Sequence, residues 1–234
     1  MRDWERKGEE STADDCHSAA KELSLSSALS ESDPYLPPFP VHSPGGLVAL
    51  RVALKCPQRV ACLVLASPAG APVSASQLAA LKDSFRLATH QAGIDFMSKV
   101  TAYPEKISGP LLHLMAWACR ARVSTPSIRA ILTTASSSHM LSAKELAGLR
   151  PPSLLIWGKH EKILPREGLE FFRRNLPRGV EINETENFGH GAYQPMSAFS
   201  HEPLLFPRGA VECLSSDISS TCLSVYLAGS AILG

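Results

Sequence analysis

The sequence predicts an α/β fold with a mostly parallel sheet, and three observations on its 234 residues support this. Apolar residues make up 44% of the chain, which is enough for one sizeable hydrophobic core. Residues 47–56 are apolar on most sides and resemble a buried helix that ends before Pro57. Residues 59–67 form a nearly continuous β-branched and apolar run, typical of a strand covered on both faces in a parallel sheet. A helix, a short connection and a buried strand make half of an α/β repeat.

The first 40 residues differ in character from the rest of the chain. Glu, Ser, Asp and Lys dominate as far as Asp33, and residues 34–40 contain four prolines. Proline has no backbone N–H and restricts the residue before it, so neither a helix nor a central strand is expected across 34–40. Residues 1–40 are therefore predicted to be a disordered or loosely attached leader.

Residues 69–150 contain no comparable strand pattern. Three stretches, at 76–100, 110–123 and 127–135, have helix-like spacing of their apolar residues and are separated by Pro and Gly. The sequence therefore predicts an all-helical insertion over 69–150.

A strand pattern resumes after this insertion. Residues 152–157 resemble a buried strand, residues 166–176 an amphipathic helix, and residues 179–186 a final strand. Beyond Phe206 the pattern fades into a Ser-rich stretch. The predicted core domain therefore covers 41–206, with an irregular tail at 207–234.

Charge and hydropathy exclude several classes of partner. The chain has 23 basic and 22 acidic residues, and its formal net charge is +1. This balance provides no long-range attraction for a phosphate backbone, so no nucleic-acid partner is expected. The most apolar segment, 222–234, is too short to cross a bilayer as a helix, so no membrane span is expected. The oligomeric state cannot be read from the sequence.

Cysteine usage and the amino terminus indicate the compartment. The six cysteines never form a C-x-x-C motif, and a chain of this length does not need disulfides to fold, so reduced thiols are expected. The first 15 residues are charged where a secretory signal requires an apolar stretch. The sequence therefore predicts a cytoplasmic protein.

Three side chains with catalytic chemistry follow these predicted elements in order. Ser43 stands just before the first helix with Gly45 and Gly46 behind it, and a serine at a tight strand-to-helix turn needs such glycines. Glu161 follows the strand at 152–157, and His190 follows the final strand. The order Ser, acid, His, each just beyond a strand, is that of the serine hydrolases built on an α/β sheet.

At these positions the sequence resembles the α/β-hydrolase fold superfamily. The segment HSPGGLVALRVALKCPQRVACLVLASP resembles the family's nucleophile elbow, the helix after it and the next strand. The segment PPSLLIWGKHEKILP resembles the strand and loop that carry the family's acid, and ENFGHGAY resembles its histidine loop. The resemblance covers residues 41–206. It implies a partial α/β-hydrolase fold, with a mostly parallel sheet and a helical cap insertion at 69–150 that covers the active site.

The same resemblance implies a serine hydrolase that cleaves a carboxylic ester or related acyl bond of a small apolar substrate through an acyl-enzyme. Ser43 would be the nucleophile, His190 the general base, and Glu161 the residue that orients the imidazole. A serine at the elbow, in place of aspartate, argues against the haloalkane dehalogenase and epoxide hydrolase branches. The implied partner is a small-molecule acyl substrate, and neither a metal nor a cofactor is required.

The sequence departs from the family pattern at several points. Val41 replaces the first glycine of G-x-S-x-G, and Pro44 stands where the family supplies an oxyanion N–H. The strand that should lead into Ser43 is not expected, because of the prolines at 34–40, and the first strands of the family have no counterpart before Val41. The alternative function is therefore a catalytically inactive fragment or remnant that acts, if at all, as a binding or interaction protein.

Each site residue also has a simpler interpretation. Ser43 could be a helix N-cap, His190 a polar loop residue, and Glu161 a solvated carboxylate, with Asp83 and Asp95 as poorly placed substitutes for the acid.

Other residues are expected near the site without a role in the chemistry. His42 and His160 are expected only to line it, and His113 to be packed on a cap helix. Four apolar side chains either line an acyl pocket under the cap or form ordinary core: Phe85, Met97, Met115 and Trp117.

Overall fold

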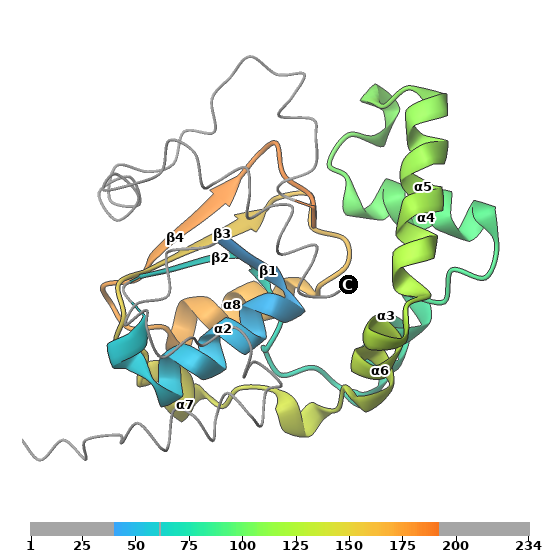
Figure 1. Cartoon of the computed structure of the whole chain (residues 1–234). Helices are drawn as coiled ribbons and strands as arrows, with labels where there is room; N and C mark the ends of the chain where they lie inside the picture. Colours follow the sequence, from blue (N-terminus) through green and yellow to red (C-terminus); the bar gives the residue numbers. More distant parts are fainter. Residues whose placement is uncertain (1–39, 61, 192–234) are drawn as a thin grey trace, which may run out of the picture.

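The computed structural model of this chain describes residues 40–60 and 62–191 (Figure 1). Within these residues, strands β1 (Pro40–Ser43), β2 (Leu63–Pro68), β3 (Ser153–Gly158) and β4 (Glu181–Thr185) form one parallel sheet in the order β1-β2-β3-β4. The predicted α/β fold with a mostly parallel sheet is thus confirmed. The leader up to residue 39 and the tail at 207–234 lie outside the described residues.

The strand that leads into Ser43 corrects the sequence-based expectation. β1 exists and pairs with β2, so that Val41 lies opposite Leu65 and His42 opposite Ala66. The prolines do not prevent it, because Pro40 occupies the first position of a strand at the edge of the described sheet. A proline at such a position removes no hydrogen bond that the ladder needs.

Three helices cover one face of this sheet: α2 (Pro44–Lys55), α7 (Ala143–Ala147) and α8 (Arg166–Asn175) (Figure 1). They form the main core with the strands through fully buried side chains such as Leu50, Leu65, Trp157 and Phe172. Because alternate strand residues point to opposite faces, a smaller cluster of Val64, Leu154 and Ile156 forms on the other face.

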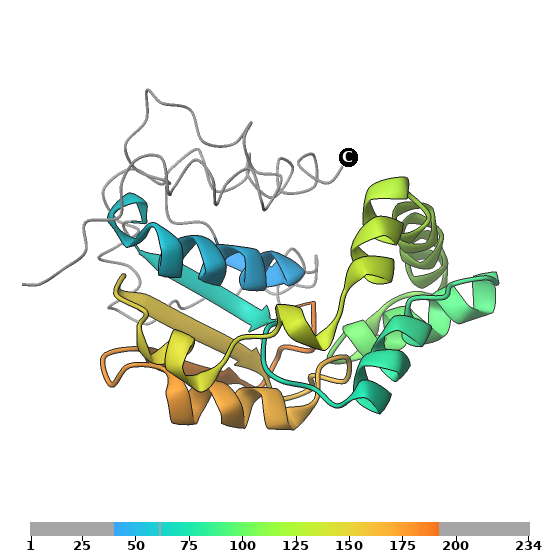
Figure 2. The same cartoon turned by 90° about the horizontal axis from the view of Figure 1, so that it is seen from below.

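Only helices connect β2 to β3, as the spacing predicts. They are α3 (Ala75–Ser84), α4 (His90–Val100), α5 (Gly109–Val123), α6 (Pro126–Thr134) and α7, with short 3-10 turns between some of them. We call residues 75–134 the helical segment. Its α4 and α5 pack through Phe96, Met97, Val100 and Ala116. The carboxyl ends of the strands point toward the helical segment (Figures 1 and 2).

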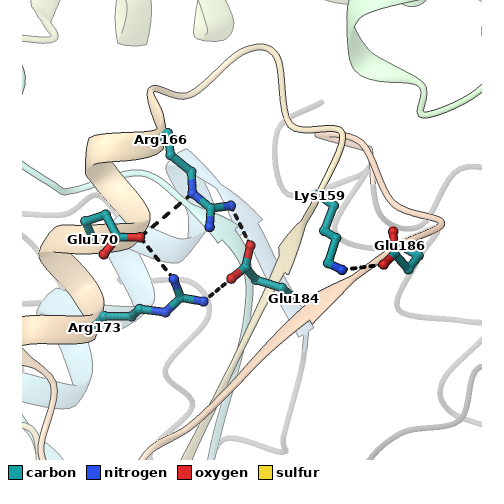
Figure 3. A network of polar contacts seen from close by, with 6 residues as sticks. All are labelled: Lys159, Arg166, Glu170, Arg173, Glu184 and Glu186. Atoms are coloured by element: carbon teal, nitrogen blue, oxygen red, sulfur yellow. Dashed lines mark hydrogen bonds and ion pairs between the residues drawn. The ribbon is translucent and has the colours of Figure 1, made fainter.

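Exposed ion pairs tie β4 to its surroundings (Figure 3). The carboxylate of Glu184 in β4 accepts hydrogen bonds from Arg166 and Arg173 of α8. Lys159, just after β3, pairs with Glu186 just after β4. The hydrogen bond from Arg166 contributes most to holding the pKa of Glu184 below its ordinary value. These contacts fix the strand that leads into the His190 loop.

Among the described residues, Cys56 departs from the expectation of reduced thiols. Cys62 and Cys119 are reduced, as expected, whereas Cys56 is disulfide-bonded. The absence of C-x-x-C spacing excludes only local pairing, so it does not exclude a bond between cysteines that are distant in sequence. Among the described residues, no helix combines the length and the apolar character needed to cross a bilayer.

The start of α2 lies very close to the end of β2. A Cβ atom placed on Gly46 would lie 2.6 Å from the Cβ atom of Pro68, whereas a Cβ atom on Gly45 would have nothing within 4 Å. Gly46, rather than the Gly45 of the G-x-S-x-G pattern, is therefore the position that must lack a side chain.

We expect Gly46→Ala to reduce the free energy of unfolding by about 1–3 kcal/mol, because the added methyl group forces β2 and α2 apart. Gly45→Ala is the matched control in the same helical turn. It should leave stability unchanged or raise it by up to about 1 kcal/mol, since alanine favours a helix over glycine. Urea unfolding followed by circular dichroism measures both values. Equal effects of the two substitutions would contradict this account of the close approach.

Candidate active site

Ser43 lies at a sharp turn between β1 and α2. Its φ of 53° and ψ of −123° place a non-glycine residue in a region that L-residues rarely adopt. The sheet register shifts at this point, so that Ser43 lies opposite Pro68, and the Ala69 N–H donates to the Ser43 carbonyl over 2.9 Å. Ser43 occupies the N-cap position of α2, but its hydroxyl makes no capping hydrogen bond to the helix.

The Ser43 hydroxyl instead contacts His190. Ser43 Oγ lies 3.0 Å from His190 Nε2, and His190 Nδ1 lies 2.7 Å from Glu161 Oε2. An ionised carboxylate accepts hydrogen bonds only, so His190 carries its proton on Nδ1, and Nε2 is left to accept the serine proton. The three residues predicted from sequence therefore form one hydrogen-bonded chain.

Glu161 is held in the loop after β3 by main-chain donors. Its Oε1 accepts the N–H groups of Ile163 over 2.7 Å and of Leu164 over 3.0 Å. Its side chain is only 3% exposed, so the interpretation as a solvated carboxylate is wrong. The substitutes are engaged elsewhere: Asp83 pairs with Arg86, and Asp95 accepts from Gln91.

The surroundings of Glu161 determine its ionisation. Burial by itself would raise the pKa of this carboxyl, but the hydrogen bond and positive charge of His190, together with the two N–H donors, lower it below its ordinary value. Glu161 is therefore an anion across the neutral range, placed to stabilise an imidazolium at His190.

His190 is buried in the turn that follows β4, and the helical segment packs against this turn. A Cβ atom on the preceding Gly189 would lie 2.6 Å from the carbonyl oxygen of Val100, the last residue of α4. The N–H of Gly191 donates to that same carbonyl over 3.0 Å. The glycine at position 189 is thus needed for α4 to approach the histidine loop.

His42 does more than line the site. Its Nε2 donates to the His190 carbonyl over 2.6 Å, and the centres of the two rings are 4.5 Å apart. Burial, and next the charge of His190, lower the pKa of His42 to about 4. The ring of His160, by contrast, packs against the ring of Tyr103, and the main-chain N–H of His160 donates to the Phe188 carbonyl. Sequence reasoning missed the His42 bond, because its partner is 148 positions away.

The two departures around the elbow have different consequences. Val41 is accommodated, since its side chain packs against the main core cluster. Pro44 is the first residue of α2, where its fixed φ suits the helix. It leaves no N–H directly after the serine.

The apolar side chains proposed for a pocket divide into two groups. Phe85, Met97 and Met115 belong to the core between α4 and α5, whereas Trp117 is 62% exposed. His113 lies on α5, where its ring is exposed to solvent and stacks on that of His90.

The pKa of His42 predicts how stability depends on pH. The unfolded chain takes up a proton at His42 near its ordinary pKa of 6.5, and the folded chain only near 4. The free energy of unfolding should therefore fall by up to about 3 kcal/mol as the pH drops from 6.5 to 4. Glu161, whose pKa is lowered from 4.5, stabilises the fold above that value, and this contribution is lost at lower pH.

His42→Gln isolates the histidine contribution, because it removes the titrating group that faces His190 and Glu161. The variant should show a smaller loss of stability between pH 6.5 and 4 in urea titrations, and the same loss below pH 4.5. Identical slopes for both proteins above pH 4.5 would show that His42 is not neutral in the fold.

Solved structures of other proteins have a similar fold. A serine hydrolase from the polyaromatic hydrocarbon-degrading bacterium Cycloclasticus zankles has a TM-score of 0.61 at 17% identity, covering 77% of this chain and 66% of that one. The 2-hydroxy-6-oxo-6-phenylhexa-2,4-dienoate hydrolase of Rhodococcus sp. strain RHA1 has a TM-score of 0.57 at 18% identity, covering 75% of this chain and 62% of that one. The carboxylesterase CesB of Bacillus subtilis has a TM-score of 0.53 at 21% identity, covering 76% of this chain and 59% of that one. The chain thus spans less than two thirds of the length of each, and at these identities the likeness shows the fold.

The amino-acid sequence itself also matches a known protein family. The family described as serine aminopeptidase, S33, matches residues 8–194, which is most of the chain. The match includes Ser43, Glu161 and His190. The chain therefore belongs to this family of α/β hydrolases.

Proposed function

We propose that this protein is a serine hydrolase that cleaves a carboxylic ester or related acyl bond of a small apolar substrate through an acyl-enzyme. The observation that carries the proposal is the continuous chain of hydrogen bonds from Ser43 Oγ through the His190 ring to Glu161. A nucleophile bonded to a base, which is in turn oriented by a third group, is the arrangement that activates a serine.

The proposed reaction follows from the positions of the protons. His190 Nε2 takes the proton of Ser43 as Oγ attacks the acyl carbon, and it then returns that proton to the leaving group. Water attacks the acyl-enzyme by the same route, releasing the acid and restoring the serine. Throughout, the carboxylate of Glu161 faces the imidazolium and stabilises it. Neither a metal nor a cofactor is required in this proposal.

The position of the helical segment supports a ligand site at the carboxyl ends of the strands. This segment lies beyond the carboxyl ends of the strands (Figures 1 and 2), where ligands bind in open α/β sheets. We assign it the role of a cap over the site, with a small apolar acyl compound as the partner. Similar proteins that are named a serine hydrolase and a carboxylesterase support acyl chemistry. The cytoplasmic location stays a prediction from the sequence.

One observation favours a second function. The residue after the nucleophile normally gives its N–H to the developing oxyanion, and Pro44 has none. A protein that keeps the three side chains but lacks this donor suits a catalytically inactive relative that binds a ligand or partner.

A fluorophosphonate probe tests the nucleophile. We expect stoichiometric labelling of the purified protein, with the modified peptide containing Ser43 by mass spectrometry, because His190 activates that hydroxyl. Ser43→Ala should abolish the labelling, and its circular dichroism spectrum should match that of the unmodified protein. A folded protein that stays unlabelled would contradict the hydrolase and favour the inactive relative.

Pro44→Ala tests the oxyanion site. It restores an N–H directly after the serine, and we expect the labelling rate constant to rise by about 10²–10³, the usual effect of one oxyanion donor. Pro126→Ala is the matched control, since Pro126 is also the first residue of a helix. It should leave the rate unchanged. No increase with Pro44→Ala would mean that other donors already hold the oxyanion.

A further inference from the structure

The peptide group that joins His190 to Gly191 is held from both sides. Its carbonyl oxygen accepts from His42 Nε2 over 2.6 Å, and its N–H donates to the Val100 carbonyl over 3.0 Å. Since a peptide group is rigid and planar, two hydrogen bonds on opposite sides fix its orientation. They thereby fix the Cα atom from which the His190 ring extends.

This segment of main chain needs such support. His190 lies between two glycines, and glycine places the fewest restraints on backbone dihedral angles. The bonds from the ring to Ser43 and Glu161 orient the imidazole, but both act at the end of a side chain. Small changes in the loop would therefore move the ring away from the serine.

We infer that His42 is a positioning residue, whose neutral imidazole donates to the His190 carbonyl and holds the base within hydrogen-bonding distance of Ser43. This inference rests on the proposed function. His42 directly precedes Ser43 in β1, so the strand that carries the nucleophile also holds the main chain of the base. Strand β1 therefore contacts His190 twice, at the ring through Ser43 and at the main chain through His42.

The chemistry of this position favours an uncharged donor. The two imidazole rings lie 4.5 Å apart, and the His190 ring becomes cationic when it takes the serine proton. A second cation at this distance would oppose that step. The low pKa of His42, about 4, keeps it neutral at working pH. The titratable groups that face His42 are His190 and Glu161, which both belong to the site.

Substitutions at His42 separate the donor from the volume of the ring. His42→Gln places an amide N–H near the position of Nε2, whereas His42→Leu fills the space without a donor. His42→Asn is polar but too short to reach the carbonyl. His139→Leu is the matched control, since the His139 side chain is exposed and bonds within its own turn. Thermal unfolding monitors the folded state of each variant.

The first readout is the rate constant of fluorophosphonate labelling across a range of pH. We expect His42→Gln and His139→Leu to stay within about threefold of the unmodified protein. His42→Leu and His42→Asn should be slowed about tenfold to a hundredfold, as expected for a small misplacement of a catalytic group. Equal rates for Gln, Asn and Leu at position 42 would overturn the positioning role.

The second readout does not depend on activity. The proton shared by His190 Nδ1 and Glu161 gives a downfield resonance in proton NMR, which reports the orientation of the base. We expect it in the unmodified protein and in His42→Gln, and expect it broadened or lost in His42→Asn. If the unmodified protein is not labelled, the proposed function fails, and the resonance alone then decides the role of His42. A resonance unchanged in His42→Asn would overturn that role.

Discussion

The described structure depends most on the buried pair of Glu161 and His190. Their contact of 2.7 Å joins the loops after β3 and β4 in a place that water barely reaches. A buried carboxylate that loses its partner destabilises a protein by about 3–5 kcal/mol, because its charge remains without compensation. The two loops must therefore stay in register. The parallel pairing of β3 with β4, and the ion pairs that hold β4 to α8 (Figure 3), maintain that register.

Ser43 reaches this pair from β1, at the same carboxyl edge of the sheet. β2 separates β1 from β3, and the end of β2 packs closely against Gly46 at the start of α2. The strained backbone of Ser43 directs its hydroxyl away from the helix and toward His190. The helical segment completes the arrangement through the Val100 carbonyl. The site is thus assembled from the ends of β1, β3 and β4 and the end of α4, which lie far apart in the sequence.

Local patterns in the sequence were sufficient to predict much of this arrangement. The buried run within 59–67 and the loops that carry Glu161 and His190 follow from hydrophobic periodicity and from the order of residue types. The failures have physical causes. The prolines at 34–40 predict no strand there, although the first position of an edge strand needs no N–H. The bond from His42 and the disulfide at Cys56 depend on tertiary contacts, which periodicity does not encode.

The hydrogen bond between α4 and the histidine loop joins two main-chain groups. The acceptor is the carbonyl oxygen of Val100, and every amino acid at position 100 would provide the same oxygen. Substitution of that side chain leaves the hydrogen bond in place, whereas an insertion or deletion that moves the end of α4 removes it. The packing of α4 on α5 therefore constrains which side chains the helical segment can carry, whereas the contact with the histidine loop constrains where α4 ends.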